Sequence, residues 1–135
     1  MHLRHKLAVA ATAVVLAGSG TIASAGPAAA VSSYAELFIS PSWDHPGYYV
    51  VVVSGHVHNG AGVRVGMRLI GDDPVFNDDL QVSRTTNTPT GEFSMEVLVW
   101  HGTLNEDPEG RDEIFAKVSA SNGWSASTAN VNGHF

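Results

Sequence analysis

Apolar and polar residues alternate with a period of two through most of the chain after residue 33, which is the pattern of β-strands that bury one face. In Val63–Ile70, for example, Met67 and Leu69 fall on one face together with two valines. Arg64 and Arg68 fall on the opposite face. Outside residues 1–25, no window shows the periodicity of an amphipathic helix. The chain therefore predicts an all-β fold.

Turn signals divide this pattern into seven predicted strands. Asn59–Gly62 and Asn122–Gly123 favour hairpin turns, because Asn and Gly accept positive φ. Val50–Val53 is apolar on both faces, which is typical of a central strand. The predicted strands are Tyr34–Ser40, Tyr48–His58, Val63–Ile70, Leu80–Thr86 (at a sheet edge), Glu92–Trp100, Glu113–Ala120 and Trp124–Val131. Seven short alternating strands in about a hundred residues predict a seven-stranded, immunoglobulin-like antiparallel β-sandwich.

The first 25 residues have the three parts of a cleavable signal peptide. A positive start, an uncharged apolar run over Leu7–Ala17 and a small-residue cleavage site at Ala23–Ala25 follow one another. The apolar run is shorter than the roughly 20 residues that span a bilayer, so we expect secretion without a membrane anchor. We place the cleavage after Ala25, with Ala28–Ala30 as the alternative site. The predicted organisation is a signal peptide over 1–25, a flexible leader over 26–33 and one β-sandwich domain over 34–135.

Charge and cysteine content restrict the classes of function. Cleavage after Ala25 would remove Arg4 and Lys6, leaving 5 Lys and Arg (7 − 2) against 13 Asp and Glu, a net charge of −8 with His neutral. Such a surface disfavours nucleic acids and anionic membranes, whereas it permits divalent cations or basic partners. The chain has no cysteine, which excludes disulfides and a catalytic thiol.

Three segments in the middle of the chain carry a resemblance to a known kind of exported module. Ser54–Val57 holds a glycine within a strand, Gly62–Val65 begins a valine-rich strand, and Thr90–Met95 places Gly91 at the entry to another strand. This pattern, over Val50–Val99, resembles the bacterial immunoglobulin-like and transthyretin-like β-sandwich modules. The resemblance implies a sandwich fold and an accessory or adhesive role, and it transfers no functional residue.

Two histidines are candidate metal ligands. His56 and His58 stand at positions i and i+2 of a predicted strand, so both would lie on one face about 7 Å apart. That spacing suits two imidazole ligands of one Zn²⁺ or Cu²⁺, with a third ligand from elsewhere in the chain. The alternative is that they form the polar end of a strand whose other face holds Val57.

Two acidic loops are candidate sites for Ca²⁺, which prefers carboxylate and carbonyl oxygens. The loops are Gly71–Asp79 and His101–Asp112, and neither matches the spacing of an EF-hand. The candidate ligands in the first loop are Asp72, Asp73, Asp78 and Asp79. The alternative is a pair of solvated loops, because turns favour Asp and Pro. Apart from this divalent cation, we expect no cofactor.

Signatures of catalysis are missing from the sequence. The chain has no Gly-x-Ser-x-Gly motif and no glycine-rich phosphate-binding loop, so we expect a protein that is not an enzyme. Trp43, in a loop of Pro and Gly, and Trp100, beside an acidic loop, are instead candidate contacts with an extracellular protein or glycan. The alternative is that one tryptophan fills the core and the others cover its ends.

The leading hypothesis is a secreted, non-enzymatic, immunoglobulin-like binding module of unknown partner, which would bind through loops at one end of the sandwich. Two alternatives remain open. One is an exported protein that binds Ca²⁺, Zn²⁺ or Cu²⁺. The other is a small secreted inhibitor of a hydrolase.

Overall fold

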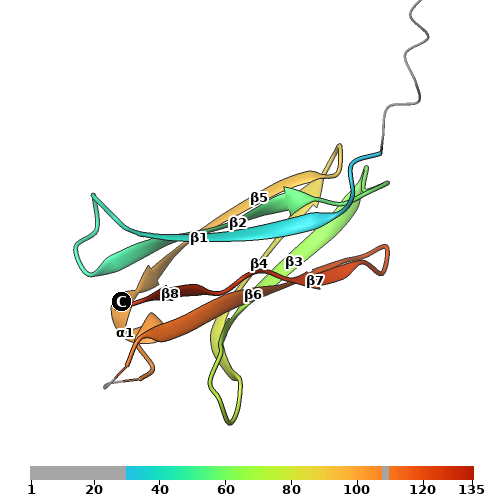
Figure 1. The fold of residues 1–135 in the computed structure, drawn as a ribbon. Coiled ribbons are helices and arrows are strands. Elements are labelled where there is room, and N and C mark those ends of the chain that lie inside the picture. Colours follow the sequence, from blue (N-terminus) through green and yellow to red (C-terminus); the bar gives the residue numbers. More distant parts are fainter. Residues whose placement is uncertain (1–29, 108–109) are drawn as a thin grey trace, which may run out of the picture.

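Two antiparallel sheets form the framework of the part of the chain that this computed structural model describes, residues 30–107 and 110–135 (Figure 1). Sheet A contains β1 (Tyr34–Pro41), β2 (Tyr48–His56) and β5 (Glu92–Trp100), in the order β1-β2-β5. Sheet B contains β3 (Val63–Gly71), β4 (Asp78–Thr88), β6 (Asp112–Ala120), β7 (Ser125–Ser127) and β8 (Val131–Gly133). Its order is β4-β3-β6-β7, and β8 also pairs with β6. The predicted all-β, sandwich-like fold is confirmed, whereas the signal peptide over 1–25 lies outside the described residues.

The core lies between the two sheets and follows the predicted alternation. Val51 and Val53 of β2 are fully buried, as are Val65 and Leu69 of β3. Sheet A also contributes Phe93, Met95 and Val99, and sheet B contributes Ile114, Ala116 and Val118. Side chains at alternate positions of a strand share a face, so the two-residue period is sufficient to predict that these residues face the core.

The prediction of one last strand over Trp124–Val131 is wrong, because this part of the chain forms two short strands, β7 and β8. The described residues therefore contain eight strands rather than seven. Lys117 pairs with Ser127 and Ile114 pairs with Val131, so the C-terminal segment holds one extra residue between these two pairs. Thr128 occupies the interruption. Its N–H donates to the Ala116 carbonyl at 2.9 Å, and its hydroxyl accepts from the Ala116 N–H at 2.9 Å. A side chain therefore replaces one backbone group of the ladder, as in a β-bulge.

The second predicted strand ends two residues early, at His56 instead of His58. The Val57 N–H donates to the Gly91 carbonyl at 2.9 Å, and the Gly60 N–H donates to the Val57 carbonyl at 3.0 Å. Asn59, with a φ of 54°, completes the turn. A turn at 57–60 therefore replaces the end of the predicted strand.

The buried Thr88 side chain holds the turn between β4 and β5. The buried Thr88 hydroxyl accepts from the Gly91 N–H at 2.8 Å and donates to the Glu92 carbonyl at 2.5 Å. Gly91 has a φ of 102°, which favours glycine. Thr88 therefore fixes the turn that joins β4 in sheet B to β5 in sheet A.

Three connections gather at one end of the two sheets, together with the C-terminus (Figure 1). They are the β1–β2 loop, the β3–β4 loop, and the segment after β5 that includes α1 (His101–Leu104), a single helical turn within a predicted loop. The described N-terminal segment enters β1 at the opposite end. The end of the two sheets that holds the three connections and the C-terminus is called the loop end. No helix in the described ranges is long and apolar enough to cross a membrane.

Candidate functional site

Aromatic side chains crowd the loop end on the side of sheet A. Trp43, in the β1–β2 loop, is 98% exposed, and Trp100 at the end of β5 is 46% exposed. Tyr48 pairs with Trp100 across the sheet, and their rings meet edge to face with centroids 5.2 Å apart. The Trp100 ring also lies against Gly47, which has no Cβ to collide with it. The two tryptophans predicted as contacts are therefore both accessible, and neither fills the core.

An apolar strip continues from this cluster along the outer face of sheet A. Strand register places Phe38 beside Val52 and Val50 beside Leu98. Phe38 is 57% exposed and Leu98 is 39% exposed. The strip consists of Phe38, Tyr48, Val50, Val52, Leu98 and Trp100. The four consecutive valines, which indicated burial on both faces, lie in a central strand with Val51 and Val53 in the core and Val50 and Val52 in this strip.

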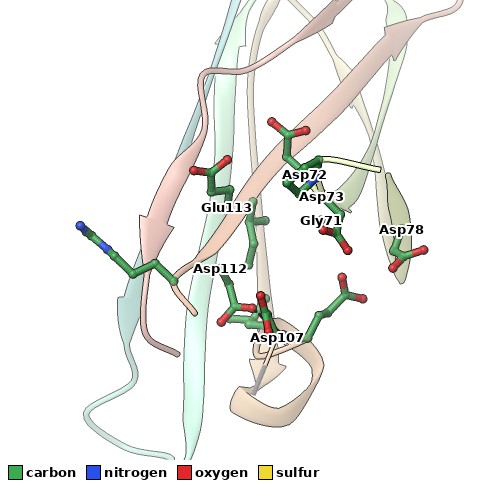
Figure 2. A pocket seen from close by; sticks show the side chains of 12 residues that line it. Gly71, Asp72, Asp73, Asp78, Asp107, Asp112 and Glu113 are labelled. Carbon is green, nitrogen blue, oxygen red and sulfur yellow. Dashed lines mark hydrogen bonds between the residues drawn. The ribbon is translucent and has the colours of Figure 1, made fainter. Parts of the chain in front are cut away.

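An acidic pocket lies on the sheet B side of the loop end (Figure 2). Its volume is about 380 Å³, and the β3–β4 loop together with residues from 104–107 and 111–114 form its walls. The two acidic loops of the sequence therefore lie side by side and enclose one space. Seven carboxylate residues line the pocket: Asp72, Asp73, Asp78, Glu106, Asp107, Asp112 and Glu113.

Some of these carboxylates have structural partners. Asp112 is buried, and its Oδ1 accepts from the N–H groups of Glu106 and Asp107 at 3.0 and 2.9 Å. This carboxylate therefore shapes the segment that closes the pocket. The Asp72 carboxylate accepts from the side-chain amide of Asn130 at 2.7 Å, which ties the β3–β4 loop to the C-terminal segment.

The pKa of Glu106 is changed by its position among these carboxylates. Loss of solvation beside the pocket raises the pKa of Glu106 above its ordinary value, and the carboxylates of Asp78, Asp112 and Asp73 raise it further. The Glu106 carboxylate lies next to Gly71, where a Cβ would displace it. The pocket is therefore a site of negative potential, to which positive charge is attracted.

The structure separates the predicted metal ligands. Of the four aspartates in the first loop, Asp72, Asp73 and Asp78 line the pocket. Asp79 points elsewhere: one oxygen accepts from the Gln81 N–H at 2.9 Å, and the other lies 3.6 Å from Arg68. Over residues 30–107 and 110–135, no three His, Asp or Glu side chains are grouped so as to hold a metal ion. The Ca²⁺ site stays a prediction.

The two histidines have different surroundings. The Nδ1 atom of His56 lies 2.7 Å from Oε1 of Glu92 on the neighbouring strand. His58 belongs to the turn after β2, and its N–H donates to the Ser33 hydroxyl at 2.8 Å. Because β2 ends at His56, the argument that placed both imidazoles on one strand face does not apply.

Sequence reasoning identified Trp43, Trp100 and the acidic loops one at a time, and it missed Phe38 and Leu98. The run Val50–Val53 did indicate an apolar outer face on this strand. However, a strand that is apolar on both faces is equally consistent with complete burial, so the exposed strip could not be predicted. Comparison of the chain with family models, with curated proteins and with solved structures found no match in any of the three.

Proposed function

We propose that this protein is a secreted, non-enzymatic binding module with an immunoglobulin-like sandwich, and that its loop end binds a basic, partly apolar segment of an extracellular protein. The observation that carries the proposal is the gathering of exposed aromatic side chains beside a pocket of carboxylates. Of the large apolar residues that are exposed in the described ranges, Trp43, Tyr48, Val75, Phe76 and Trp100 all belong to this end.

The strand order supports the immunoglobulin-like assignment. In the constant-type sandwich the first, second, fourth and fifth strands form one sheet, and the third, sixth and seventh form the other. Here β1, β2 and β5 form sheet A, and β3, β6 and β7 lie in sheet B. Two strands differ: β4 pairs with β3 instead of joining β5, and the extra strand β8 pairs with β6.

The chemistry of the loop end favours a cationic partner. Tryptophan and tyrosine are enriched among the residues that contribute most to protein interfaces, and their ring faces also attract Lys and Arg. Carboxylates around the pocket add attraction for the same side chains and oppose acidic partners.

The experiment measures binding of a short labelled peptide in which lysine and leucine alternate, by fluorescence anisotropy at low ionic strength. A peptide with glutamate in place of lysine is the control ligand. We expect Trp43→Ala to weaken binding of the lysine peptide by about tenfold or more, because an exposed aromatic anchor carries a large share of interface energy. Because Trp43 is 98% exposed, this variant keeps the fold.

Tyr34→Ala is the matched control, because Tyr34 is an aromatic residue that is 46% exposed at the opposite end of β1. It should bind the lysine peptide as the unmodified protein does. Equal binding of the glutamate peptide, or equal losses in Trp43→Ala and Tyr34→Ala, would contradict the proposal.

A further inference from the structure

The few cations of this acidic protein are gathered on one sheet. The described residues hold five Lys and Arg, and Arg64, Arg68, Arg84 and Lys117 all lie on β3, β4 and β6 of sheet B. The fifth, Arg111, lies beside the acidic pocket. Register places Arg68 directly beside Lys117. Like charges at paired positions destabilise a sheet, so the fold itself does not favour this arrangement.

Two of these cations, Arg68 and Lys117, border a groove on the outer face of sheet B. The groove has a volume of about 540 Å³ and extends over β3, β4, β6 and β7. Arg68 and Lys117 line it together with five hydroxyl side chains: Ser83, Thr85, Ser119, Ser125 and Ser127. Arg84 contributes only backbone, because register pairs it with the buried Met67 on the opposite face of the sheet. Arg68 lies 3.6 Å from Asp79, whereas Lys117 forms no ion pair within the described ranges. The groove therefore combines uncompensated positive charge with hydrogen-bonding hydroxyls.

Gly66 forms the middle of the groove, and packing does not require a glycine there. It lies in the central part of β3, between Thr85 on β4 and Ser119 on β6. A Cβ on Gly66 would lie 3.5 Å from Thr85 Cγ2 and 3.8 Å from the Arg84 carbonyl oxygen, which are ordinary contacts. A glycine inside a strand weakens it, and it often marks a place where a ligand approaches the backbone. Its effect here is to keep the groove open.

We propose that this groove binds an anionic sugar, a saccharide that carries carboxylate, sulfate or phosphate groups. The guanidinium group of Arg68 and the ammonium group of Lys117 hold the anionic groups through charge-assisted hydrogen bonds. The serine and threonine hydroxyls exchange hydrogen bonds with the sugar hydroxyls. The groove volume falls in the range of small-molecule sites, roughly 300–1,000 Å³, so a short saccharide segment fits better than a folded protein.

The net charge of the protein limits the length of the bound segment. Carboxylates elsewhere on the molecule repel a long polyanion, whereas a short segment within the groove meets mainly the local cations. This inference concerns sheet B and does not depend on the loop end.

The experiment measures binding of three anionic oligosaccharides by isothermal titration calorimetry at low ionic strength. A heparin oligosaccharide supplies sulfate, an oligogalacturonate supplies carboxylate, and a phosphorylated mannooligosaccharide supplies phosphate. A neutral maltooligosaccharide is the control. We expect at least one anionic probe to bind, with an affinity that falls as salt is added, and the neutral control not to bind.

Three variants locate the site. Lys117→Gln should weaken binding by about tenfold, because it removes one charge-assisted contact. Arg111→Gln removes the same charge outside the groove and should leave binding unchanged. Gly66→Val places a side chain in the groove and should weaken binding by about tenfold or more, while thermal unfolding stays at or above that of the unmodified protein.

Three outcomes would overturn the proposal. The first is that no anionic probe binds at low ionic strength. The second is equal loss in Lys117→Gln and Arg111→Gln, because affinity would then follow net charge only. The third is that sedimentation shows a concentration-dependent assembly that Lys117→Gln abolishes, because the cations of sheet B would then bind the acidic loop end of a second copy.

Discussion

Gly55→Ala is the substitution whose effect on stability follows most directly from the structure. Gly55 lies in β2, between Ala35 of β1 and Phe93 of β5. A Cβ at this position would collide with the Tyr34 carbonyl oxygen, and it would lie 2.8 Å from Phe93 Cζ and 3.0 Å from Ala35 Cα. Two of these three contacts are with backbone, which cannot move aside as the end of a side chain can.

The expected loss follows from overpacking. Extra carbon in a well-packed interior destabilises by about 1–3 kcal/mol, which lowers the thermal midpoint of a domain of this size by about 5–20 °C. The assay is thermal unfolding followed by circular dichroism, with denaturant unfolding to convert the shift into a free energy.

Gly66→Ala is the matched control for this prediction. The chemical change is the same and the residue also lies inside a strand, but the added Cβ meets only ordinary contacts of 3.5 Å or more. We expect no loss, and a gain of about 0.5–1 kcal/mol because alanine restricts the unfolded chain. Equal stability of the two variants would refute the argument that the packing around Gly55 requires a glycine.

Three further predictions concern the turn, the pocket and the cation site. Thr88→Val should lower the free energy of unfolding by about 1–3 kcal/mol, because it leaves the Gly91 N–H without its acceptor, and Thr88→Ser should restore most of the loss in the same denaturant assay. The folded protein binds a proton at Glu106 more tightly than the unfolded chain, whose pKa is near 4.5, so stability falls as pH rises through the folded-state pKa. Glu106→Gln should therefore raise the thermal midpoint at neutral pH, the gain should vanish below pH 4.5, and a gain that persisted in acid would contradict the assignment to this carboxyl. If Ca²⁺ binds the pocket, an ion concentration a hundred times its Kd should stabilise the protein by about 2.7 kcal/mol, and unchanged unfolding with Ca²⁺, Zn²⁺ and Cu²⁺ would remove the cation prediction.

Local features of the chain were readable from the sequence because they depend on a few consecutive residues. The two-residue period assigned Met67, Leu69, Phe93 and Ile114 to the core, and all four are buried. The edge position of β4 was also predicted, although the strand extends beyond Leu80–Thr86 at both ends. The predicted bounds of two strands were wrong where distant segments form hydrogen bonds with the backbone. The Thr128 hydroxyl accepts from the Ala116 N–H, and the Gly91 carbonyl accepts from the Val57 N–H.

The sequence by itself determined an all-β chain with acidic loops and an alternating core. Only the tertiary structure decided that Asp73 and Glu106 share one pocket, and that Arg68 and Lys117 border one groove. The physical reason is that periodicity fixes which face a side chain takes, whereas its neighbours depend on strand order and register across the sheets. Both candidate surfaces are built from residues far apart in the chain, so neither has a signature within any single segment.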